Sequence, residues 1–113
     1  MSKPIDLDHL AHYTGGEKSI NAEILRLFDS QVTDMVCQLN TLLAVRDAKR
    51  WREITHTIKG AARGVGAFAM GAAAADAEPV DPATNPDRAI EVIEALRIQG
   101  EAVQAFIAEY LAA

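Results

Sequence analysis

The amino-acid sequence predicts an all-α protein, an up-and-down four-helix bundle with a short additional N-terminal helix. Aromatic residues make up only 5% of the 113 residues and alanine is abundant, which favours helices packed through aliphatic and small side chains. Long stretches carry apolar residues at steps of three and four, the period of an amphipathic helix. The sequence shows no strand pattern. At this length we expect a single domain over residues 1–113.

The first two expected helices are separated by a glycine turn. The first covers residues 6–13, where Asp6 or Asp8 suits an N-cap or first-turn position, and it is broken by the glycine pair at 15–16. The second covers residues 17–44 and has a long apolar stripe facing the core. This stripe consists of Leu25, Phe28, Val32, Met35, Val36, Leu39, Leu42 and Leu43.

Asp47 is expected to cap a third helix, and Gly64 and Gly66 mark its end or a kink. The alanine-rich stretch over residues 67–78 is expected to continue as helix. The apolar positions of the third helix are Trp51, Ile54, Ile58, Ala61, Ala62 and Val65.

A proline-rich loop precedes the last expected helix. Pro79, Pro82 and Pro86 mark this loop, and Pro86 suits the first turn of a helix over residues 86–111. The expected apolar stripe of this helix consists of Ile90, Ile93, Leu96, Val103, Phe106, Ile107, Tyr110 and Leu111. The expected core anchors are Phe28 and Trp51.

Charge and cysteine content narrow the class of protein. The formal net charge is −5, so we do not expect a nucleic-acid partner. The single cysteine, Cys37, cannot form an internal disulfide, which fits a reducing compartment, and we expect it to pack beside the stripe of the second helix. The sequence shows neither a signal peptide nor a run apolar enough to span a bilayer, so we expect a soluble cytoplasmic chain with no membrane partner.

One histidine of the third helix is expected to point away from the core. At roughly 100° per residue, Ile54, Ile58, Ala61 and Val65 fall within about 40° of the side opposite His56. His56 should therefore face solvent or a partner.

Cations surround this histidine in an otherwise acidic protein. Lys49, Arg52, Lys59 and Arg63 all lie within about 60° of His56 around the helix, and Glu53 is the only acidic residue expected on this patch. Gly60 follows one turn after His56 on the same face, although glycine in a helix interior costs about 1 kcal/mol relative to alanine. A missing side chain at this position would leave the imidazole open to a bulky partner.

These residue types suit phosphoryl chemistry. A neutral imidazole nitrogen is nucleophilic near neutral pH, so it can attack a phosphoryl group and hold it as a phosphoramidate. The dianionic product needs nearby cations, which Lys59, and Arg63 or Arg52, can supply.

The stretch from Thr55 to Gly66 (THTIKGAARGVG) resembles the His-x-[Leu/Ile]-Lys-Gly-[Ser/Ala]-[Ser/Ala]-x-x-[hydrophobic]-Gly signature of histidine-containing phosphotransfer domains. The glycine pair at 15–16 and the segment over residues 25–28 are also similar to the family, and the likeness extends from Ile5 to about Leu111. One departure is the alanine-rich stretch from Ala72 to Ala77, where relatives often have a bulkier leucine before the glutamate.

The resemblance implies a role for each motif residue. His56 would carry the phosphoryl group on Nε2, Lys59 would support its charge and Gly60 would give access. The remaining residues around the motif, expected in partner docking or phosphate support, are Arg52, Arg63, Lys49 and Gly64. The family passes phosphoryl groups between receiver-domain aspartates, often from a hybrid sensor histidine kinase to a response regulator. It has no ATP site, so we expect no autonomous kinase activity. We also expect no cofactor and no metal. Because one chain supplies the whole bundle in such proteins, the resemblance implies a monomer.

Two other functions are alternatives to the phosphoryl carrier. A helical module that docks on a receiver or kinase without carrying phosphate would use the same cationic face. A hydrolytic or metal enzyme has little support, because paired carboxylates, a metal-ligand cluster and a Ser/His/Asp arrangement are not apparent. His9 and His12 have a spacing that can bind a metal, but no third ligand is apparent and we expect them to be surface residues.

Overall fold

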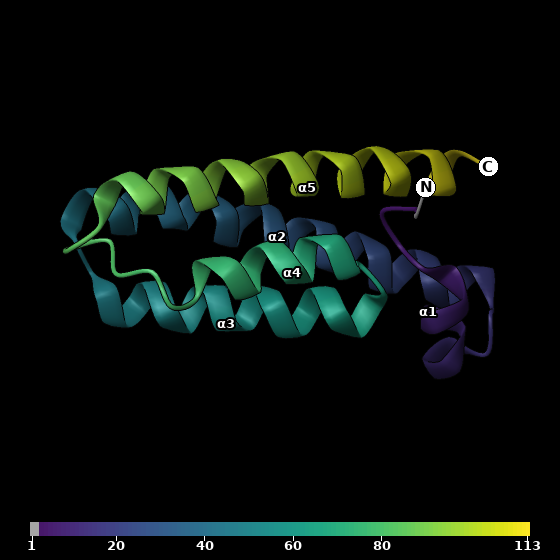
Figure 1. The fold of residues 1–113 in the computed structure, drawn as a ribbon. Helices are drawn as coiled ribbons and strands as arrows, with labels where there is room; N and C mark the ends of the chain where they lie inside the picture. The colour runs from purple at the N-terminus through teal and green to yellow at the C-terminus, as the bar shows by residue number, and fades with distance from the viewer. Residues whose placement is uncertain (1–2) are drawn as a thin grey trace.

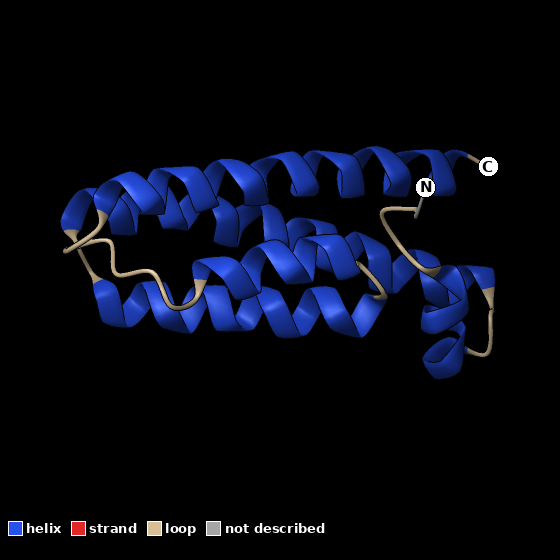
Figure 2. Ribbon diagram, in the orientation of Figure 1, coloured by secondary structure: helices blue, strands red, loops and turns tan. Residues whose placement is uncertain are grey.

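The computed structural model describes residues 3–113 and confirms the all-α bundle. Within that range it has helices joined by loops, with no strand (Figure 2). The helices are α1 (Leu7–Thr14), α2 (Lys18–Val45), α3 (Ala48–Val65), α4 (Phe68–Ala77) and α5 (Pro86–Ala112). Each boundary lies within one residue of the predicted one. No helix of the described residues is long and apolar enough to cross a bilayer.

Helices α2, α3, α4 and α5 form a four-helix bundle, in which α4 is much shorter than the other three. Helix α2 packs against α3 and α5, and α4 packs against the same two helices from the other side (Figure 1). The molecule is 45 Å long and 22 Å by 21 Å across. Helix α1 contacts α2 and α3 at the end where the C-terminus lies. At the opposite end α4 stops short, and the loop over residues 78–85 continues to the start of α5 (Figure 1).

Side-chain caps define where three of the helices begin. Asp6, Asp47 and Asn85 each accept a hydrogen bond from the backbone N–H three residues later, at 3.1, 3.0 and 3.2 Å. The caps at Asp6 and Asp47 confirm the predicted starts. Pro86 is at the first helical position of α5, as predicted, but the cap at Asn85 before it was not predicted. Each cap satisfies one backbone N–H that has no partner within its own helix.

The predicted stripes form most of the core, with two corrections. Phe28 and Trp51 are buried, at 4% and 0% exposure, as core anchors should be. Ile90, predicted to be buried, is 57% exposed because α5 instead turns Ala89 and the residues three and four after it toward the core. Cys37, predicted to pack beside the stripe, is exposed because it lies about 100° around the helix from its half-buried neighbour Val36.

Helix α4 lies very close to α3 because small residues face that neighbour. Gly71 is buried, and a Cβ added to it would stand 3.1 Å from Arg63 Cγ and 3.7 Å from the Lys59 carbonyl oxygen. The buried alanines of α4 are Ala73, Ala74 and Ala77. Side chains larger than these would hold the two helices further apart.

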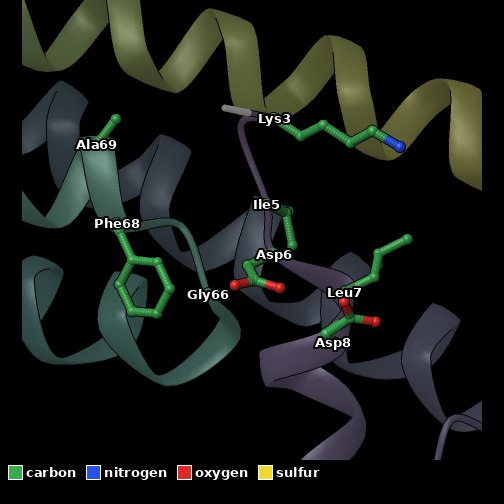
Figure 3. Close-up of a pocket in the computed structure, with 8 residues that line it drawn as sticks. All are labelled: Lys3, Ile5, Asp6, Leu7, Asp8, Gly66, Phe68 and Ala69. Carbon is green, nitrogen blue, oxygen red and sulfur yellow. The ribbon is translucent and has the colours of Figure 1, made fainter. Parts of the chain in front are cut away.

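The turn after α3 is joined to the N-terminal segment through Gly66. This glycine ends α3 with a φ of +87°, and its carbonyl accepts a 2.9 Å hydrogen bond from the Asp6 N–H. A Cβ on Gly66 would lie 2.6 Å from the Asp6 carbonyl oxygen. Figure 3 shows Asp6 beside Gly66, at a groove of about 510 Å³ that Phe68 also lines. Close backbone contact therefore holds the N-terminal segment on the bundle.

Replacing Gly66 should weaken this end of the bundle. We expect Gly66→Ala to lower the free energy of unfolding by about 2 kcal/mol or more, because it forces a side chain into a left-handed conformation and onto the Asp6 carbonyl. Urea denaturation followed by circular dichroism measures the change. The matched control is Gly64→Ala, whose Cβ would meet no described atom within 4 Å and which should be neutral or stabilise by about 0.5–1 kcal/mol. Equal effects of the two variants would contradict the prediction.

Candidate functional site

His56 lies near the middle of α3 and points away from the core. Its side chain is 69% exposed. On the same helix Ile54 and Ile58 are buried, at 5% and 0% exposure. Thr55, next to the histidine, is also buried, and its hydroxyl donates to the Trp51 carbonyl at 2.9 Å. The outward orientation predicted from the helical period is therefore present.

The closest polar partner of His56 comes from the end of α4. Glu78 Oε1 lies 2.8 Å from His56 Nδ1. The prediction that Glu53 is the only acidic residue of this patch is wrong, because α4 returns along α3 and brings Glu78 to the histidine. The lengths of the two predicted helices could have indicated this contact. His56 lies nine residues before Val65, the end of α3, and Ala77, the end of α4, lies nine residues after Phe68, where α4 begins following a tight turn.

Lys59 is bound by the same carboxylate. Its Nζ donates to Glu78 Oε2 at 2.7 Å and to Oε1 at 3.2 Å. The two side chains are 21% and 20% exposed, whereas those of the surface pair Arg50–Glu53 are 52% and 50% exposed. An ion pair that is shielded from water is screened less by salt than an exposed one. The Glu78 carboxylate therefore links Lys59 to His56. We call these three side chains, His56, Glu78 and Lys59, the imidazole–carboxylate–ammonium cluster.

The cluster determines which imidazole nitrogen of His56 keeps a free lone pair. The hydrogen bond from Lys59, and next that from His56, lowers the pKa of the Glu78 carboxyl below its ordinary value of 4.5, against a smaller opposing effect of burial. An ionised carboxylate only accepts hydrogen bonds, so Nδ1 of His56 must carry the proton. In the neutral imidazole this leaves Nε2 with a free lone pair, a tautomer assigned here from the hydrogen-bond partner.

A shallow depression lies beside the imidazole. Its volume is about 370 Å³, and it is lined by Lys49, Arg52, Glu53, His56 and Glu78. Two of the four predicted cations, Lys49 and Arg52, thus share one concavity with His56. The surface there combines a nucleophile with cations that could meet a dianionic group.

The other predicted site residues lie further along α3. A Cβ added to Gly60 or to Gly64 would meet no described atom within 4 Å, and both glycines are exposed. Arg63 lies about two turns from His56, and its side chain packs beside Gly71 of α4. Gly66 is a helix end, as predicted. Positions 60 and 64, one and two turns after His56, therefore present no side chain on this face of α3.

The two histidines of α1 are away from this cluster. His9 packs edge-on against Phe68 and Tyr13, with ring centroids 5.0 Å and 5.5 Å apart, and the His12 ring bonds the Asp8 carbonyl oxygen. Residues 3–113 hold no group of three or more histidine, cysteine, aspartate or glutamate residues that could bind a metal ion.

A comparison with protein-family models matches residues 23–109 to the Hpt domain. Comparisons with curated proteins and with solved structures returned no match. The matched range runs from the first turns of α2 to near the end of α5, and it includes every residue of the imidazole–carboxylate–ammonium cluster. Hpt domains serve histidine phosphotransfer in phosphorelays, where they interact with receiver domains and kinases. With most of its length matched and the expected helical bundle in place, the chain belongs to the Hpt domain family.

Proposed function

We propose that this chain is a monomeric cytoplasmic phosphorelay carrier and that His56 is its phosphoryl acceptor. In this role Nε2 takes the phosphoryl group from a receiver-domain aspartate of a hybrid sensor histidine kinase and passes it to the aspartate of a response regulator. The observation that carries the proposal is the 2.8 Å contact between Nδ1 and the Glu78 carboxylate, which directs the free lone pair to the exposed nitrogen.

The proposed transfer needs no reactant other than His56 and the phosphorylated aspartate of the partner. The Nε2 lone pair of His56 forms a bond to phosphorus, while the bond between phosphorus and the aspartate oxygen breaks and leaves a carboxylate. The imidazole is then a cation that keeps its Nδ1 proton, and the negative Glu78 carboxylate stabilises it. In the second transfer an acceptor carboxylate attacks phosphorus and the N–P electrons return to Nε2.

Charge near the imidazole supports both steps. Arg52 and Lys49 line the depression beside His56, which supports a role for both in binding the phosphoryl oxygens. Lys59 has three N–H groups, of which Glu78 takes two, so its main task is to hold the carboxylate ionised and in place. Phosphoryl transfer depends mostly on positioning and charge, and an exposed histidine lets the partner supply the remainder.

The partner reaches His56 across the open part of α3. Gly60 and Gly64 present no side chains there, so a folded receiver domain can approach the imidazole closely. In this proposal Gly60 provides access, while Gly64 and Arg63 belong to the docking surface beyond it.

Replacing His56 should abolish phosphoryl acceptance. We expect wild type, incubated with an autophosphorylating hybrid kinase, its receiver domain and labelled ATP, to take up label that is labile in acid and stable in base. His56→Gln should take up none. The matched control is His12→Gln, which removes an exposed histidine of α1 and should be labelled like wild type.

Label on His56→Gln would show that another residue accepts the phosphoryl group. If wild type takes up no label from a panel of receivers but wild type and His56→Gln bind them equally, the chain is a docking module that carries no phosphate.

A bulky residue at Gly60 should block a protein donor but spare a small one. We expect Gly60→Leu to slow transfer from a phosphorylated receiver by about tenfold or more, since misplacing the partner by an ångström is costly. Labelling by phosphoramidate, a small donor that needs no docking, should stay close to wild type. Gly60→Ala is the graded control, and it should also raise the free energy of unfolding by about 1 kcal/mol. Equal slowing with both donors would argue against an access role.

The stabilising effect of Glu78 should persist to acidic pH. Its carboxyl has a lowered pKa in the folded protein, so its contribution is complete above the ordinary value of 4.5 and is lost as the pH falls through the lowered pKa. The measurement is the difference in free energy of unfolding between wild type and Glu78→Gln, from neutral pH to roughly pH 3. We expect a constant difference until the pH passes below the ordinary range of glutamate. A difference that grows with acidity would contradict the assigned pairing.

A further inference from the structure

We infer that Trp51 is a positioning residue: its indole holds the end of α4, and thereby the Glu78 carboxylate, in place against His56. This inference rests on the proposed function, because it concerns how the nucleophile is prepared.

The contact joins the buried side of α3 to the last residue of α4. Trp51 is fully buried, and its Nε1–H donates to the Ala77 carbonyl at 2.9 Å. That oxygen also accepts a 3.1 Å hydrogen bond from the Val80 N–H, so both of its lone pairs are used. The residue after Ala77 is Glu78, whose side chain turns outward to His56 and Lys59.

The end of α4 is also held by the buried Ala74 and Ala77 and by the Lys59–Glu78 pair, but its backbone is a weak point. The last carbonyls of any helix lack intrahelical partners, and helix ends open more readily than helix interiors. Helix α4 is 10 residues long, and among the described residues no side chain caps its start. Pro79 follows Glu78 and has no N–H to extend the hydrogen-bonded ladder. The indole therefore gives the backbone next to Glu78 an additional anchor on α3.

A single rigid helix carries both the anchor and the nucleophile. Trp51 and His56 are five residues apart on α3, which places them about 7.5 Å apart along the axis and about 140° apart around it. The indole thus holds Ala77 from inside the bundle while the imidazole meets Glu78 at the surface. Because α3 is an uninterrupted helix from Ala48 to Val65, the indole contact helps to set the position of Glu78 relative to Nδ1.

The test compares the tautomer of His56 in variants that lose one hydrogen bond each. Long-range ¹H–¹⁵N correlation spectra of the neutral imidazole distinguish Nδ1–H from Nε2–H. We expect mainly Nδ1–H in wild type, and in Trp51→Phe a shift toward Nε2–H, the form that an unrestrained histidine favours. Tyr110→Phe is the matched control, because it removes the 3.1 Å bond to Asn21 at the far end of the bundle and should leave the tautomer unchanged.

A second replacement guards against a packing defect in Trp51→Phe. The chain has one tryptophan, so 3-benzothienylalanine introduced at position 51 keeps the shape of the indole and removes only its N–H donor. We expect it to shift the tautomer as Trp51→Phe does. A folded variant that keeps the wild-type tautomer would overturn the inference.

The rate of phosphoryl acceptance tests the inference independently of the tautomer. With phosphoramidate as the donor, we expect Trp51→Phe to accept label about tenfold more slowly than wild type. If the indole acts through Glu78, the double variant Trp51→Phe/Glu78→Gln should be no slower than Glu78→Gln alone. Additive losses would overturn the inference. Absence of label on wild-type His56 would instead refute the proposed function, and the tautomer comparison would still decide the role of Trp51.

Discussion

Helix α4 can lie against α3 because Gly71 has no side chain where the two helices meet, and an added Cβ would stand 3.1 Å from Arg63 Cγ. This close approach, continued by buried alanines, sets the lateral distance between the helices. The short turn at Gly66 sets their relative height. Together they bring Glu78 level with His56, so the chemistry of the surface depends on tight packing that begins at the opposite end of α4.

One carboxylate then has several tasks. Glu78 orients the imidazole, holds the Nδ1 proton and pairs with Lys59, which in turn keeps it ionised. The arrangement follows the general logic by which an acid that is held in place fixes the tautomer of a neighbouring histidine. Here the acid stands at the end of another helix, so any change that moves α4 also changes the orientation of the His56 imidazole.

The sequence was sufficient for much of this structure. The outward direction of His56 followed from the period of α3, because the buried residues of that helix define one continuous face. The starts at Asp6 and Asp47 followed from local capping chemistry.

Features that depend on several helices at once were harder to predict. Glu78 was missed because it is 22 residues from His56 and meets it only through the geometry of the α3–α4 turn. Ile90 and Cys37 were misplaced because each lies beside a true core position, where a periodic pattern cannot tell which neighbouring helix is near.

The high exposure of His56 also determines how donor and acceptor would bind in the proposed relay. A single imidazole nitrogen on one open face can engage one receiver at a time, so donor and acceptor must compete for the same surface and cannot be bound together. Turnover would then require one partner to leave before the next arrives. Tight binding by either partner would slow the relay, and modest affinity for both would serve it best.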